Sequence, residues 1–139
     1  MPHQEKRAWL MIVAMAVTFG PYFAITSCSN APSLPGLHQL GMFAVTVIAQ
    51  VIILIVGHIV LAIREPREEQ APPDERDRAI ERRSMVSAYY VLICGMILVG
   101  CVMPFKSSGW AIVNAALLMI VIAELVHYGV VVWNYRRQA

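Results

Sequence analysis

The chain has 139 residues, of which 58% are hydrophobic and 14% are charged, and its formal net charge is +2. An average soluble domain carries about 25% charged residues, so this composition excludes an ordinary soluble protein. The small net charge also argues against nucleic acid as a partner, since such proteins neutralise several phosphates with basic side chains. We therefore expect a single membrane domain over residues 1–139, without enzymatic activity of its own.

Four long uncharged segments predict four transmembrane helices. They cover residues 8–27, 40–63, 85–105 and 110–133, and the last is interrupted only by Glu124. Segments of about 20 residues match a hydrocarbon core of about 30 Å, because an α-helix rises about 1.5 Å per residue. Their content of Val, Ile, Leu, Met and Ala favours helices over the strands of a barrel. The expected fold is an all-α, four-helix transmembrane bundle.

The positions of the basic residues predict the topology. Of the 11 Lys and Arg residues, all except Lys106 fall in the N-terminal segment, the loop of residues 64–83 or the C-terminal segment. Basic residues concentrate in cytoplasmic loops, so both termini and this loop are expected in the cytoplasm. The two helical hairpins would then be parallel in orientation, in a bacterial inner (cytoplasmic) membrane.

The loop of residues 64–83 is the only sizeable polar segment. Asp74 follows two prolines and precedes an alternation of acids and arginines, so it is a suitable N-cap for a third helix that starts outside the membrane. The arginines predict a contact site for a partner protein or anionic lipid. The alternative is a solvated turn whose arginines only fix the topology. The residues concerned are Arg76, Arg78, Arg82 and Arg83.

Short similar segments in the second and fourth helices indicate a duplication. Residues 47–51 resemble residues 121–125, and the match places Gln50 opposite Glu124. Each segment lies in the second helix of its hairpin. The two hairpins would then be repeats in the same orientation.

Polar residues within the spans predict an intramembrane seam between the second and fourth helices. Its expected members are Glu124, His127, Gln50, His58 and Asn114. Ionisable residues inside a membrane are rare and often functional, and a carboxylic acid there can load and release protons. The structural alternative is that Glu124 hydrogen bonds to Gln50 or His127 and joins helices within the chain or between subunits.

Metal and cofactor binding have limited support in the sequence. Glu124 and His127 form a Glu-x-x-His pair, but a di-iron bundle needs a second such pair and further carboxylates, so no metal site is expected. His58 and His127 lie at similar depths from the arginines that end their helices. Binding of haem b or a quinone by these histidines is therefore an alternative to the expectation of no cofactor.

The cysteines suggest lipidation or packing rather than catalysis. Residues 25–28 fit a bacterial lipobox after a basic and an apolar stretch, so Cys28 is a candidate lipidation site. The alternative is that a short pattern of this kind arises by chance where a helix meets a polar loop. Cys94 and Cys101 share one face of the third helix with small residues and predict a close helix-packing surface there. Those residues are Ser84, Ser87, Ala88 and Gly95.

One stretch resembles a known family. Residues 73–83, Pro-Asp-Glu-Arg-Asp-Arg-Ala-Ile-Glu-Arg-Arg, run into Ser87-Ala88-Tyr89-Tyr90-Val91-Leu92. This pattern resembles small prokaryotic multi-pass membrane proteins of the DUF2178 type, in which an Asp-Glu-Arg segment precedes a hydrophobic hairpin. The resemblance implies a bacterial or archaeal membrane protein and no assigned activity.

The sequence thus favours an accessory, regulatory or complex-assembly protein. Membrane lipids are expected as partners, together with a second copy of the chain or a larger membrane complex. The first alternative is an oligomeric proton-coupled transporter or channel that uses Glu124. The second is a redox protein that binds haem or a quinone through His58 and His127.

Overall fold

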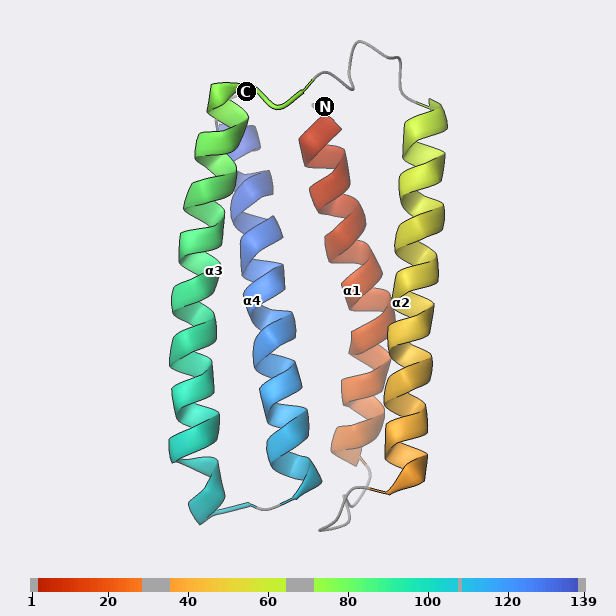
Figure 1. The fold of residues 1–139 in the computed structure, drawn as a ribbon, viewed down its shortest axis with the longest axis vertical. Coiled ribbons are helices and arrows are strands. Elements are labelled where there is room, and N and C mark those ends of the chain that lie inside the picture. Colours follow the sequence, from red (N-terminus) through yellow and green to blue (C-terminus); the bar gives the residue numbers. More distant parts are fainter. Residues whose placement is uncertain (1–2, 29–35, 65–71, 108, 138–139) are drawn as a thin grey trace.

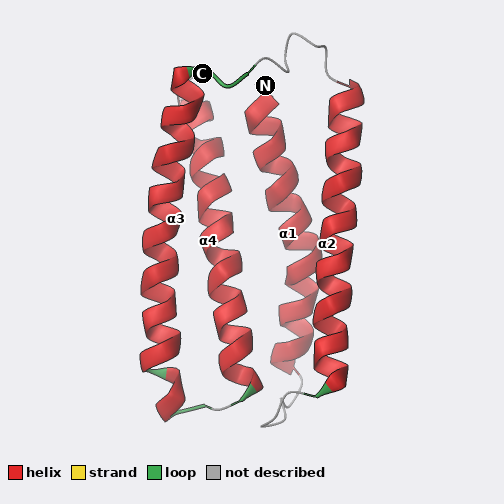
Figure 2. Cartoon of the chain, in the orientation of Figure 1, coloured by secondary structure: helices red, strands yellow, loops and turns green. Residues whose placement is uncertain are grey.

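The computed structural model describes residues 3–28, 36–64, 72–107 and 109–137. Within these residues the chain forms four long α-helices and no strand, which confirms the predicted fold class (Figures 1 and 2). Each helix is long and apolar enough to cross a membrane. The helices are α1 (His3–Cys28), α2 (Leu37–Arg64), α3 (Glu75–Cys101) and α4 (Trp110–Arg137), with a short 3-10 helix η2 (Met103–Phe105) before α4.

The four helices lie side by side in the order α3, α4, α1, α2 (Figure 1). The principal contacts join α3 to α4, α4 to α1 and α1 to α2, so the inner positions belong to the first and last helices. The two hairpins, α1–α2 and α3–α4, run in the same direction. Both chain ends and the α2–α3 connection therefore lie at one end of the bundle, which we call the terminal end.

Helix α3 begins well before the apolar segment that predicted it. Asp74 is its N-cap, as the sequence predicts: its carboxylate accepts from the backbone N–H of Glu75 at 2.7 Å, and it forms a capping box with Asp77. These bonds satisfy N–H groups that have no partner within the helix. Much of the predicted loop of residues 64–83 is thus helical, although residues 65–71 lie outside the described part of the chain.

Two glycines allow close helix contacts, one in each hairpin. A Cβ atom on Gly95 of α3 would lie 2.6 Å from Met119 Sδ of α4, and one on Gly57 of α2 would lie 2.6 Å from Leu10 Cδ1 of α1. Small residues at such positions let helix backbones approach in membranes, where lipid tails are as apolar as the side chains.

The predicted packing face of α3 needs one correction. Ser84 is fully buried and Gly95 contacts α4, but Cys94 and Cys101 are exposed. The face toward α4 follows Ile80, Ser84 and Gly95, so the two cysteines lie beside it. A small side chain alone does not identify the contacting face of a membrane helix.

The buried apolar residues concentrate at the terminal end. Their largest cluster joins the inner helices α1 and α4 to the first turns of α3. Tyr128 and Ile12 pack against it. The cluster consists of Ala8, Ile80, Val131, Val132 and Tyr135.

Candidate functional site

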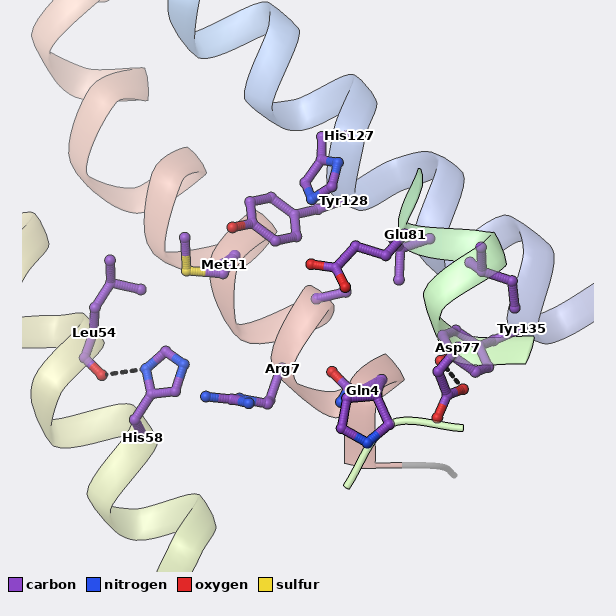
Figure 3. A pocket seen from close by; sticks show the side chains of 14 residues that line it. Gln4, Arg7, Met11, Leu54, His58, Asp77, Glu81, His127, Tyr128 and Tyr135 are labelled. Carbon is purple, nitrogen blue, oxygen red and sulfur yellow. Dashed lines mark hydrogen bonds between the residues drawn. The ribbon is translucent and has the colours of Figure 1, made fainter. Parts of the chain in front are cut away.

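A hollow of about 320 Å³ opens beside this cluster, at the terminal end of the bundle (Figure 3). All four helices contribute to its wall, and we call it the hollow. Its polar members come from both hairpins, and its apolar members include Met11, Leu54 and Ile80. Ligand sites between the helices of a bundle combine apolar walls with a few placed polar groups, as this one does. The polar lining residues are Gln4, Arg7, His58, Asp77, Glu81, His127, Tyr128 and Tyr135.

The structure brings His58 and His127 to the same hollow, although from α2 and α4. The Nδ1 atom of His58 donates to the carbonyl oxygen of Leu54 at 2.7 Å. The Nδ1 atom of His127 lies 3.0 Å from the Ser84 hydroxyl, whose single proton is donated to the Glu81 carbonyl at 2.7 Å, so the histidine is the donor. Both rings thereby keep Nε2 available as an acceptor in the neutral form.

On the opposite side of the hollow, Asp77 accepts hydrogen bonds from α4 and from the N-cap of its own helix, α3. The Tyr135 hydroxyl of α4 donates to Asp77 Oδ1, while Asp77 Oδ2 accepts from the backbone N–H of Asp74 at 3.3 Å. Tyr135 is 6% exposed, so its bond is made among apolar neighbours where a hydrogen bond to a carboxylate is strong. The first turns of α3 are therefore fixed against α4.

Arg7 and Glu81 are members of the hollow that the sequence did not single out. Figure 3 shows Arg7 extending from α1 toward His58, and Glu81 extending from α3 into the space beside Tyr128. Among the described residues, neither side chain makes an ion pair. A guanidinium can bind an anionic group and a carboxylate can bind a cationic one, so the hollow offers both kinds of contact.

The sequence contains a signal for the face of α3 that borders the hollow. Asp77, Ile80, Glu81 and Ser84 follow the i, i+3, i+4, i+7 spacing of one helix face. That face carries the charged residues Asp77 and Glu81 where it borders the hollow. No comparable spacing indicates Arg7, since nothing in the sequence tells which side of α1 meets α4.

The structure does not bring Gln50 to Glu124. The predicted seam lay between the second and fourth helices, but α1 lies between them and supplies the partners instead. Thr18 of α1 donates to Gln50 Oε1, and Tyr22 of α1 donates to Asn114 Oδ1 at 2.8 Å. In the described part of the chain, the predicted seam residues are thus divided among three helix interfaces.

Glu124 lies one turn from His127, in a shallow groove between α3 and α4 that we call the α3–α4 groove. The carboxylate is partly buried and, among described residues, has no hydrogen-bond or ion-pair partner. The groove shares His127 and Tyr128 with the hollow, so the two are adjacent. Its lining residues are Met85, Ala88, Tyr89, Leu92, Ala123, Glu124, His127 and Tyr128.

Three of the four predicted arginine contacts lie on the other side of α3 from the hollow. Arg78, Arg82 and Arg83 line a shallow, open depression with Glu75, Ala79 and Val86. Arg76 is also exposed, but it lies one turn before Ile80 and close enough to Tyr135 to interact with it electrostatically, so it does not belong to this face. We call the exposed face formed by Arg78, Arg82 and Arg83 the arginine surface.

A charged contact closes the terminal end between the inner helices. Arg136 of α4 donates to Glu5 of α1 at 3.3 Å, and its guanidinium lies 5.4 Å from the Trp9 ring centroid. Glu5 is only 4% exposed, so its buried carboxylate depends on Arg136 for charge compensation. The candidate lipidation residue Cys28 is exposed at the opposite end of α1.

No group of three or more His, Cys, Asp or Glu side chains that could hold a metal ion occurs among the residues described. The histidines of the hollow are instead surrounded by Arg7, Met11 and Tyr128 (Figure 3). The arrangement is one of binding contacts: an arginine, two carboxylates and two imidazoles around a space of limited size.

In comparisons with curated proteins and with solved structures, nothing matches this chain. The family model described as "Predicted membrane protein (DUF2178)" matches residues 5–139. The match includes all four helices and every residue of the hollow except Gln4. It confirms the resemblance carried by residues 73–92, and the chain belongs to the DUF2178 family of multi-pass membrane proteins.

Proposed function

We propose that this protein is a non-catalytic, regulatory or accessory membrane protein that couples a bound ligand to a partner. In this proposal the hollow receives the ligand and the arginine surface contacts the partner. The family description supplies only a membrane protein, and the geometry of α3 supports the finer role.

One observation carries the proposal: the first turns of α3 have two different faces. Asp77, Ile80 and Glu81 line the hollow, whereas Arg78 and Arg82 lie on the face that points away from it. The capping box and the bond from Tyr135 hold these turns as a regular helix. A shift of the helix caused by a ligand on one face therefore moves the arginines on the other.

The basic residues place the terminal end in the cytoplasm in this proposal, because basic segments remain on that side. The arginine surface then faces cytoplasmic proteins or a larger membrane complex. The outer face of α2 is apolar, with Ile52, Ile55 and Ile59 exposed, and suits lipid or a second copy of the chain.

Co-purification tests the partner-binding part of the proposal. The tagged protein is cross-linked in native membranes, and the amount of each recovered partner is compared for the wild type and the double variant R78Q/R82Q. Loss of two interface charges is expected to lower recovery about tenfold, which corresponds to about 1.4 kcal/mol.

The matched control is Arg137→Gln, which removes an exposed arginine at the same end of the bundle, on α4. It is expected to leave recovery unchanged. Equal recovery with R78Q/R82Q and with Arg137→Gln contradicts a role for the arginine surface. Purification of the wild type with no partner at any cross-linker concentration contradicts the accessory role itself.

A second candidate function is favoured by Glu124. This carboxylate is partly buried in the α3–α4 groove, one turn from His127 and without a described partner, as a proton-carrying residue in a membrane would be. If the protein is a proton-coupled transporter, Glu124→Gln abolishes proton uptake into vesicles that contain a pH-sensitive dye. The control Glu75→Gln, outside the groove, keeps it. Equal uptake by all three proteins excludes this function.

A further inference from the structure

The hollow carries opposite charges on its two sides. Arg7 and His58 belong to the α1–α2 hairpin, whereas Asp77 and Glu81 belong to the α3–α4 hairpin. Figure 3 shows Arg7 and His58 on one side of the hollow and Glu81 and Asp77 on the other. A single ligand that enters between the hairpins therefore meets a cationic and an acidic wall.

The charged residues of the hollow differ in whether they already have hydrogen-bond or ion-pair partners. Asp77 accepts from Tyr135 and from the backbone of Asp74, and its contacts are structural. Arg7 and Glu81, in contrast, form no ion pair with each other or with any other residue described. Both are exposed, so a ligand can reach them. Among the residues described, the unpaired charges of the hollow are thus one cation and one anion.

The hollow has an apolar continuation. Tyr128 and His127 border both the hollow and the α3–α4 groove, whose wall toward the middle of the bundle includes Met85, Ala88 and Leu92. Glu124 is the one acidic residue of this groove. A molecule with a polar head in the hollow can therefore extend an acyl chain along α3 and α4.

The depth of the hollow agrees with a lipid head. Tyr128 precedes Arg136 by two turns of α4, about 12 Å along the helix axis. Arg7 lies little more than one turn from the start of α1 at His3. Because the helices end there in charged residues, we expect this zone to lie at the polar border of the bilayer, where phospholipid heads are found.

We propose that the hollow binds the head of a zwitterionic phospholipid with a primary ammonium group, of the phosphatidylethanolamine type. The phosphate contacts Arg7, the ammonium group contacts Glu81, and one acyl chain lies in the α3–α4 groove. Arg is suited to phosphate because its planar guanidinium donates two parallel hydrogen bonds. This inference names the ligand of the proposed function and rests on the hollow being its binding site.

The charge pattern distinguishes this ligand from other lipids. An anionic phosphatidylglycerol head would satisfy Arg7 but leave Glu81 facing a like-charged molecule. A phosphatidylcholine head carries both charges, but its quaternary ammonium cannot donate a hydrogen bond to a carboxylate. A neutral quinone head would pair with neither charge.

Native mass spectrometry of the purified protein in detergent provides the test. Phosphatidylethanolamine, phosphatidylglycerol and phosphatidylcholine with the same acyl chains are titrated separately. One phosphatidylethanolamine molecule is expected to bind about tenfold more tightly than either of the other lipids. Glu81→Gln should remove the preference over phosphatidylglycerol, and Arg7→Gln should weaken phosphatidylethanolamine binding about tenfold.

Two control variants change the same residue types outside the hollow. Glu75→Gln lies on the outer face of α3, and Arg137→Gln on α4 replaces an arginine outside the hollow and the arginine surface; both should keep the wild-type preference. Free phosphoethanolamine, which has the head without the chains, should bind at least about tenfold more weakly than the lipid. Leu92→Trp, which fills the α3–α4 groove, should weaken the lipid but leave phosphoethanolamine unchanged.

Equal wild-type affinity for phosphatidylethanolamine and phosphatidylglycerol overturns the proposal, as does an unchanged preference in Glu81→Gln. Phosphoethanolamine that binds as tightly as the lipid overturns the assignment of a lipid and indicates a soluble zwitterion. Circular dichroism verifies that each variant keeps its helices. The assay contains no partner protein, so its failure is distinct from a failure of partner binding in R78Q/R82Q.

Discussion

The two hairpins hold their helices together by different means. In α3–α4, polar side chains join the helices at the terminal end, where His127 meets Ser84 and Tyr135 meets Asp77. In α1–α2, the bond from Thr18 to Gln50 joins the helices near their middle. The difference teaches that polar bonds join α3 to α4 at the hollow, so a ligand there moves these two helices together.

Replacing the two glycines at the helix contacts is expected to change the stability of the hairpins most. Gly95→Leu should lower the free energy of unfolding by about 2–3 kcal/mol, because overpacking forces the helices apart. A Cβ atom at Gly95 would lie 3.1 Å from the Cβ atom of Met119. The Met119 Cβ is bonded to the backbone and cannot move aside. Gly57→Leu should cost less, because the atoms it meets are the movable end of Leu10.

Thermal unfolding in detergent, followed by helical circular dichroism, measures both glycine variants. Gly100→Leu is the control in the same helix as Gly95, since a Cβ at that position meets no atom within 4 Å. It should change stability little. A Gly95 variant no less stable than the Gly100 variant would contradict the close contact of α3 with α4.

Removing one hydroxyl tests the polar link of the α3–α4 hairpin. Tyr135→Phe should destabilise the protein by about 1.5–2 kcal/mol, since hydrogen bonds to charged groups exceed neutral ones. The control Tyr89→Phe changes an exposed tyrosine of α3 and should have no such effect. Equal stability of both variants in the same thermal assay would show that the bond to Asp77 contributes nothing.

The N-cap of α3 is expected to have a smaller and more local effect. Asp74→Ala should cost about 1 kcal/mol, because it leaves N–H groups of the first turn without a partner. Hydrogen exchange of the amides of residues 75–78 should accelerate, while amides near Gly95 stay protected. Glu75→Ala keeps the cap and should accelerate exchange less. Uniform acceleration along α3 would show that the cap stabilises the whole helix rather than its start.

The α1–α2 hairpin should tolerate the loss of its polar contact, the smallest effect of the series. Gln50→Leu is expected to change stability by less than about 0.5 kcal/mol or to raise it. The reason is that Gln50 Nε2 is buried without a described partner, and that the Thr18 hydroxyl can donate its single proton to the Ala14 carbonyl, 2.9 Å away, once Gln50 is replaced. A loss as large as that of Tyr135→Phe, measured in the same assay, would make the two hairpins alike.

The number and type of elements were predictable from the sequence because a bilayer requires long, uncharged helices. The N-cap Asp74 was predictable as well, since its side chain acts locally. The order of the helices was not. Each spanning helix is apolar on all its sides. No hydrophobic face of α1 therefore indicates that it lies between α2 and α4.

For the same reason only part of the candidate site could be anticipated. His58 and His127 were recognised because they interrupt apolar spans, and they do line one hollow. Arg7 and Glu81 were not, because a charge near a helix end is normally solvated. Their role depends on α1 and α3 meeting at the terminal end, which is a property of the fold rather than of either segment.

The inner position of α1 has a consequence for how the protein is made. Tyr22 bonds to Asn114, 92 residues later, and Glu5 bonds to Arg136, 131 residues later. During synthesis, the first hairpin therefore enters the bilayer with these side chains unpartnered, and they find their partners only when the last helix has been inserted. Truncation of the final turns of α4 should leave a chain that inserts into the membrane yet is recognised by quality-control proteases.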